Sequence, residues 1–228
     1  MYSSNTYIML SDMRDVFFQS DPFNYQYRLW TPPKAQLVVF LEAYPRGIIN
    51  NCRYNKGWIR RCYGQNAVER IGHNNISITG IVMGTRNAIL VYSSILLNQT
   101  AHKTRLQYGA NKYENIQKYC KSTGMDQAFH NWILYTGILE KYMKIRIFPQ
   151  GEGPVNTVGY LTQDDIEPSS IKTILRGQPP HAVIVNNNAD PSPVVHQLDT
   201  FIKMPLFDST YVGVLEAMEG LFDANTKK

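Results

Sequence analysis

Hydrophobic residues occur along this chain in short runs, and polar or turn-forming residues separate one run from the next. Three runs lie in the first third of the sequence, at residues 7–10 (YIML), 36–42 (QLVVFLE) and 75–82 (NISITGIV). Continuous apolar runs of about four to eight residues, rich in β-branched side chains, are typical of buried strands. The pattern predicts further short strands at residues 143–148, 155–161 and 182–185.

Longer segments between these runs have helical spacing of their apolar positions. We expect a turn of helix at residues 13–19, which Pro22 would stop. The longer helices are predicted at residues 58–72, 85–97, 111–121, 126–141 and 206–222. Strands that alternate with helices predict the α/β class, with a mostly parallel sheet whose ligand site lies beyond the carboxyl ends of its strands.

Length and composition agree with one packed domain. The chain has 228 residues, of which 43% are hydrophobic and 18% are charged, so global disorder is excluded. We expect a single domain over residues 1–228, with a C-terminal helix and a frayed tail at 206–228. The net charge is +5, and the only tight basic groups are residues 60–61 and 227–228. Without a basic stripe, a nucleic-acid partner is not expected.

The sequence shows neither a signal peptide nor a membrane span. No uninterrupted apolar run reaches about 18 residues, and the nearest, residues 76–97, contains Arg86. We therefore expect a soluble chain that is cytoplasmic as written, and a secretory lumen if the true N-terminus is missing. Three cysteines are too few for a disulfide scaffold. Cys52 and Cys62 could close a small loop or stay reduced, and Cys120 is odd in either case.

Two carboxylates follow the first predicted strand. Asp12 and Asp15 could hold Mg²⁺ or Mn²⁺, which prefer oxygen ligands and bridge diphosphates. The alternative is that Asp12 caps the next helix and Asp15 pairs with Arg14. His196, in the late segment PVVHQLD, could complete a metal shell, although a lone histidine is a weak signal.

Residues 126–131 (DQAFHN) open a predicted helix. Asp126 is a natural N-cap there, and Gln127 lies one helical turn before Asn131, so one polar face could meet a sugar. His130 is better explained as a packing residue than as a base. Residues 77–85 run from a strand into a glycine turn, which brings a ligand close to the backbone or is a simple tight turn.

Four stretches together resemble one family. The segment YIMLSDMRDVFFQSDPF resembles the part of GT-A-type glycosyltransferases where a strand ends in the acidic metal motif. DQAFHN resembles the Asp-Gln-x-x-x-Asn segment of the glycogenin-like, retaining members. SITGIVMGT is similar to their acceptor-side Ser/Asn-x-Gly segment, and PVVHQLD is similar to their late histidine motif. The stretches occur in family order, over residues 7–199.

The resemblance implies a GT-A-like fold, with a mixed, mostly parallel sheet flanked by helices, and a metal-assisted transfer from a nucleotide sugar to a glycan or glycoprotein acceptor. Asp12 matches the first acid of the family's metal motif, and His196 matches the third ligand. The second acid falls on Arg14, so Asp15 substitutes for it one position later. Arg14 could itself bind the diphosphate.

The same resemblance assigns residues to the sugar. It implies that Asp126 and Gln127 lie below the anomeric carbon, and that Thr79 and Gly80 face the donor sugar and the acceptor. The family places a nucleotide-binding segment before its acidic motif, whereas here the motif begins at Asp12. We therefore expect an N-terminally truncated GT-A architecture.

Two other functions remain open at this stage. One is a catalytically inactive remnant that binds a glycan or a nucleotide without turnover. The other is a basic module for anionic polymers, whose affinity would fall steeply with salt. The modest charge of the chain argues against the second.

Overall fold

The computed structural model describes residues 6–13, 15–23, 35–105, 120, 123–160, 186–187, 190–191 and 193–197. The chain divides into two compact units. The first unit consists of Met1–Asp12 and Gln26–Gln150, and the second of Met13–Tyr25 and Gly151–Lys228. The expectation of a single domain over residues 1–228 stays a prediction.

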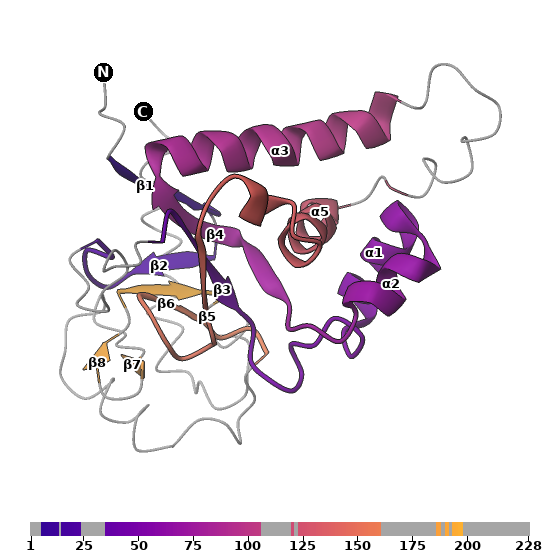
Figure 1. The fold of residues 1–228 in the computed structure, drawn as a ribbon. Coiled ribbons are helices and arrows are strands. Elements are labelled where there is room, and N and C mark those ends of the chain that lie inside the picture. Colours follow the sequence, from indigo (N-terminus) through magenta and orange to yellow (C-terminus); the bar gives the residue numbers. More distant parts are fainter. Residues whose placement is uncertain are drawn as a thin grey trace, which may run out of the picture. The chain divides into compact units, whose positions relative to one another are not determined.

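The first unit is built on a four-stranded mixed sheet in the order β1-β4-β3-β5 (Figure 1). Its strands are β1 (Tyr7–Ser11), β3 (Leu37–Leu41), β4 (Ser77–Thr85) and β5 (Ile145–Phe148). β4 runs antiparallel to both β1 and β3, and β5 runs parallel to β3. The α/β class is confirmed. The expectation of a mostly parallel sheet is wrong for the described strands, because β4 reverses direction between β1 and β3.

Despite the reversed direction of β4, all four strands have an end at one shared edge of the sheet. β1, β3 and β5 run in the same direction, so their carboxyl ends meet the start of β4 at one edge of the sheet. β3 is central and buried along Leu37–Phe40, as its continuous apolar sequence predicts. β1 was expected to be buried, but it is an edge strand with partly exposed side chains.

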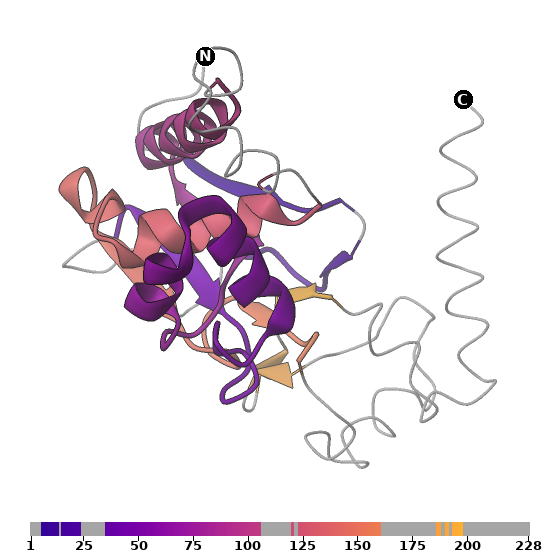
Figure 2. The same ribbon diagram turned by 90° about the vertical axis from the view of Figure 1, so that its right-hand side faces the viewer.

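Helices pack against this sheet or against one another (Figure 2). They are α1 (Arg53–Tyr63), α2 (Gln65–Ile71), α3 (Arg86–Arg105) and α5 (Met125–Tyr135), followed by the short 3-10 helix η1 (Leu139–Lys141). α5 lies against β4, with α1 and α3 packed on it. The single helix expected at 58–72 is two helices, because Gly64 has a positive φ of 88° between them.

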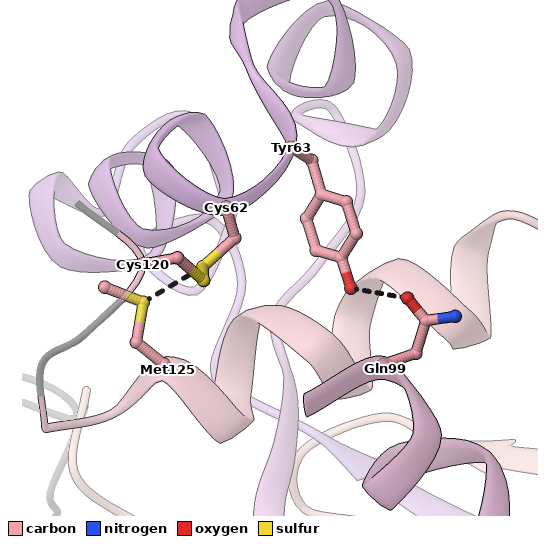
Figure 3. Close-up of a disulfide and its surroundings, with 5 residues drawn as sticks. All are labelled: Cys62, Tyr63, Gln99, Cys120 and Met125. Atoms are coloured by element: carbon pink, nitrogen blue, oxygen red, sulfur yellow. Dashed lines mark hydrogen bonds between the residues drawn. A yellow bond between two sulfur atoms is a disulfide. The ribbon is translucent and has the colours of Figure 1, made fainter. Parts of the chain in front are cut away.

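A disulfide joins Cys62, in the last turn of α1, to Cys120, near the start of α5 (Figure 3). The Sγ of Cys62 also lies 3.2 Å from the sulfur of Met125. The proposed alternative of a Cys52–Cys62 bridge is wrong. These two cysteines lie at opposite ends of α1, which separates them by about 15 Å at 1.5 Å per residue. Cys52 lies outside the disulfide, and its buried sulfur caps α1.

The second unit contains a three-stranded sheet in the order β2-β9-β6. Its strands are β2 (Val16–Phe18), β6 (Val155–Thr157) and β9 (Val194–His196), and β9 pairs antiparallel with β2 and parallel with β6. A two-residue pair, β7 (Asn186–Asn187) and β8 (Asp190–Pro191), is also present. The helical turn expected at 13–19 is wrong. Its β-branched and aromatic residues form β2 instead.

Several expectations fall outside the described residues. These are the strand at 182–185, the helix at 206–222 and, apart from Cys120, the helix at 111–121. Among the residues that the structure describes, no helix is both long and apolar enough to cross a membrane.

Candidate functional site

The first group of predicted site residues gathers at the shared edge of the first unit's sheet. Asp12 follows β1, and its backbone N–H donates to the carbonyl of Gly80 on β4 at 2.7 Å. Thr79 precedes Gly80 on the same strand and is half-buried. The sequence therefore correctly placed Asp12 at a strand end, beside the small residues of β4. The expected role of Asp12 as a helix cap is wrong, because β2 rather than a helix follows.

Side chains of α5 form hydrogen bonds with the backbone of β4 at this edge, where a neighbouring strand is missing from the described residues. β1 pairs with β4 only from Ile81 onward, so Ser77 and Thr79 have no strand partner on that side. The Oε1 of Gln127 accepts hydrogen bonds from the N–H of Thr79, at 2.9 Å, and from its hydroxyl. The Nε2 of Gln127 donates to the carbonyl of Ser77.

Asn131, one helical turn further along α5, makes the matching contacts. Its Oδ1 accepts from the N–H of Ser77, and its Nδ2 donates to the carbonyl of Ser77, each at 2.9 Å. Two side-chain amides thus replace a neighbouring strand. The expected spacing of Gln127 and Asn131 on one face is confirmed, but that face binds β4. Because both ends of the Gln127 amide are engaged, the structure gives Gln127 a positioning role.

His130 lies in the same layer and is fully buried. Its Nε2 is 2.8 Å from the Ser77 hydroxyl, and its Nδ1 is 2.8 Å from the Tyr92 hydroxyl. Burial lowers the pKa of His130 to about 3, so the ring is neutral at physiological pH. The Ser77–His130 pair has the composition of a nucleophile and its base, yet neither residue is exposed. His130 is a packing residue, as the sequence indicates.

The start of α5 is fixed by a glycine. Gly124 is the N-cap, with a φ of 85°, and a Cβ there would lie 2.4 Å from the Trp58 ring. The expectation that Asp126 is the N-cap is therefore wrong. Asp126 lies in the first turn of α5 with an exposed side chain. The carboxylate that was expected to face the sugar is thus open to solvent.

The second group of predicted residues lies in the second unit. Asp15 immediately precedes β2, and the β2–β9 register pairs Val16 with His196. The N–H of Gln197 donates to the carbonyl of Asp15 at 2.8 Å, which fixes the two strand ends side by side. The Nε2 of His196 then lies 3.8 Å from the Oδ1 of Asp15. The sequence predicted these two residues as partners although they lie near opposite ends of the chain.

A separation of 3.8 Å is too long for a hydrogen bond. It is close to the separation of two ligands on one cation, about 3–4 Å for bonds near 2.1 Å. His196 is 3% exposed and Asp15 is 20% exposed, so the site is sheltered but accessible on the carboxylate side. Asp12, the third predicted ligand, lies three residues before Asp15 in the sequence and ends the first segment of the first unit. Two carboxylates and an imidazole are a donor set suited to Mn²⁺ or Mg²⁺.

Arg14, the other predicted diphosphate ligand, lies outside the described residues. The sequence reasoning did not identify Ser77 and Tyr92 as partners of His130. Neither has a recognisable motif, and their pairing depends on how α3 and α5 pack on β4. No protein-family model, curated protein or solved structure matches this chain.

Proposed function

We propose that this protein is a glycosyltransferase that moves a sugar from a nucleotide-diphosphate donor to a glycan or protein acceptor, with metal assistance and retention of configuration. One observation carries the proposal: Asp15 and His196 stand 3.8 Å apart on paired strands. We assign Asp12, three residues before Asp15, as the second carboxylate, as the sequence predicts. Departure of a nucleotide diphosphate places negative charge on oxygen, which a bound cation stabilises.

Each predicted residue then has a task. Asp12, Asp15 and His196 hold Mn²⁺ or Mg²⁺, and the cation supplies charge neutralisation at the diphosphate when it is bound. The exposed carboxylate of Asp126 faces the sugar, where an oxocarbenium-like centre needs a nearby negative charge. Gln127 keeps the backbone of Thr79 in a fixed position beside the sugar, so the reactants meet a preorganised surface.

A specific observation also favours a second function, binding without turnover. Both ends of the Gln127 amide are engaged with β4, so this side chain does not reach a substrate in the described arrangement. In that case the protein is an inactive glycan- or nucleotide-binding relative of such enzymes. Donor hydrolysis distinguishes the two, because a binding protein retains nucleotide affinity and releases no sugar.

The disulfide supports a proposal for the compartment in which the protein works. We propose an oxidising compartment such as the secretory lumen, because disulfides persist there and are rare in the cytosol. Mass spectrometry of protein from its native source, alkylated before reduction, tests this directly. Alkylation of Cys62 and Cys120 in the untreated protein would contradict the placement.

A thermal-shift panel tests the proposed function. Nucleoside diphosphates and nucleotide sugars are added to the full chain with and without Mn²⁺. A ligand that binds only the folded state stabilises it by about 2.7 kcal/mol at a hundredfold excess over its Kd. We expect one nucleotide to raise the melting temperature only when Mn²⁺ is present, and the Asp15→Asn variant to lose that increase.

Glu152→Gln is the matched control. Glu152 is an exposed carboxylate of the second unit that is not among the proposed ligands, so this variant makes the same charge change at another position. It should keep the Mn²⁺-dependent increase of the wild type. A nucleotide shift that is independent of metal, or one that Asp15→Asn keeps, would contradict the proposed metal assistance.

A further inference from the structure

One buried polar side chain of the second unit has no place in the scheme above. Thr157, the last residue of β6, is 1% exposed. Its hydroxyl oxygen makes no hydrogen bond in the described part of the chain. Burying a hydroxyl without a partner costs about 1–3 kcal/mol.

The sheet itself does not require a hydroxyl at this position. Valine has the same shape as threonine and an equal preference for strands. Three other buried positions of this sheet are in fact valines, at Val155, Val194 and Val195. A threonine that carries an unsatisfied hydroxyl is therefore a cost to the fold, and costs of this kind are typical of functional sites.

The position of Thr157 suggests what the hydroxyl is for. The parallel pairing of β6 and β9 places Thr157 directly opposite His196. Partners in register project their side chains from the same face of a sheet, and adjacent strands lie about 4.8 Å apart. The N–H of Val158 donates to the carbonyl of His196 at 3.0 Å, which fixes this register at the strand ends. The hydroxyl therefore stands beside the imidazole that faces Asp15.

We infer that Thr157 is a positioning residue of the cation site, and that its Oγ1 hydrogen-bonds an oxygen in the coordination shell of the cation. That oxygen belongs to a bound water when the cation is alone and to a diphosphate when the donor is present. This inference rests on the proposed function, because it takes Asp15 and His196 as cation ligands. Outer-shell partners of metal ligands are typically worth 10–100-fold in metal affinity.

The test compares Thr157→Val with Thr157→Ser in the full chain. Mn²⁺ binding is measured by the electron paramagnetic resonance signal of free Mn²⁺, first with Mn²⁺ alone and then with inorganic pyrophosphate. We expect Thr157→Val to weaken Mn²⁺ binding about tenfold or more. Thr157→Ser, which keeps the hydroxyl, should stay within about threefold of the wild type. A loss in the first arm identifies a bound water, and a loss confined to the second arm identifies a phosphate oxygen.

Melting of the metal-free proteins separates this role from a structural one. A valine removes an unsatisfied hydroxyl, so Thr157→Val should melt at or above the wild-type temperature without Mn²⁺. A lower metal-free melting temperature would make the hydroxyl structural and overturn the inference. Equal Mn²⁺ affinity of wild type and Thr157→Val in both arms would overturn it while leaving the proposed cation site intact. A wild type that binds no Mn²⁺ in either arm would overturn both.

Discussion

The two units bury polar side chains in opposite ways. In the first unit, the buried Ser77, His130 and Asn131 satisfy one another and the backbone of β4. In the second unit, Thr157 is equally buried, yet its hydroxyl has no hydrogen-bond partner among the described residues. His196 is in register with Thr157 and lies 3.8 Å from Asp15, a distance beyond hydrogen bonding.

This difference separates scaffold from site. A fully satisfied network fixes one arrangement and makes its own members unavailable to a ligand. A buried group that lacks a partner is retained at a cost to stability, which a bound ligand can repay. We therefore expect substitutions in the first network to lower stability without changing cation affinity. Substitutions at Thr157 should lower cation affinity without lowering stability.

The largest expected effect is that of the covalent link in the first unit. The Cys62–Cys120 bond closes a separation of 58 residues. Replacing both cysteines with serine should lower the free energy of unfolding by about 4 kcal/mol, because the unfolded chain gains loop entropy. Guanidinium denaturation measures the loss, and Mn²⁺ affinity below the melting temperature should be unchanged.

Cys52→Ser is the control for this pair. Cys52 lies outside the disulfide and caps α1, where its sulfur accepts from the N–H of Asn55. Serine is a favoured N-cap, so stability should stay within about 0.5 kcal/mol of the wild type. Equal stability of the double variant and the wild type would mean that the disulfide does not stabilise the first unit.

The second largest effect on stability is expected for Asn131, one of the two side-chain amides that bond to β4 in place of a strand. Asn131→Ala leaves the N–H of Ser77 buried without its acceptor and opens a small cavity. We expect a loss of about 3 kcal/mol in the free energy of unfolding. The exposed Asn66 of α2 is the matched control, because Asn66→Ala makes the same change in a helix without a buried partner. A loss below about 1 kcal/mol for Asn131→Ala would contradict the scaffold role.

The sequence predicted the features that depend on residues close together in the chain, and missed those that depend on residues far apart. The apolar runs of β3 and β4 and the helical spacing of α3 and α5 are local signals, and these elements were predicted. The strand β2 was missed because its three residues form a strand only through pairing with β9, far along the chain. The direction of β4 was missed for the same reason, since local patterns carry no information on pairing.

The site shows the same limit. Asp12, Asp15 and His196 were predicted because a carboxylate pair after a strand and a late histidine have a recognised chemistry. Thr157 has no such signature, and its importance depends on the β6–β9 register. Gln127 was identified as polar and functional, yet its contact with Thr79 was not predicted, because that contact depends on how α5 packs on β4.

Glu42, like Asn55, is an exception in the first unit, and its carboxyl group lets the comparison be tested through pH. It follows β3, is 3% exposed, and its Oε2 has no hydrogen-bond partner among the described residues. Burial raises the pKa of Glu42 to about 8, whereas the unfolded chain has a value near 4.5. The folded state therefore holds a proton that the unfolded state releases, and stability should fall as pH rises from about 4.5 to 8.

The measurement is the free energy of unfolding at pH 6 and pH 7.5. The wild type should lose about 2 kcal/mol between them, and Glu42→Gln should remove that loss because the amide does not titrate. Glu69→Gln, an exposed carboxylate of α2, should keep the wild-type pH dependence. A Glu42→Gln variant with the wild-type slope would mean that another group titrates in this range.

The smallest effect on stability is expected for a substitution of Asp126. Its neighbour Gln127 should have a larger effect, and comparing the two residues tests the proposed function. Asp126→Asn removes an exposed charge in the first turn of α5, worth about 0.3–1 kcal/mol. Gln127→Ala removes the hydrogen bonds to the backbone of Ser77 and Thr79 and should lower the free energy of unfolding by about 2 kcal/mol.

If Asp126 faces the sugar, Asp126→Asn should lower the rate of sugar transfer or donor hydrolysis at least tenfold, which is about 1.4 kcal/mol in the activation barrier. Mn²⁺ binding should be unchanged. Wild-type turnover in Asp126→Asn would exclude this carboxylate from the reaction, and a stability loss above about 2 kcal/mol would place it in the scaffold with Gln127.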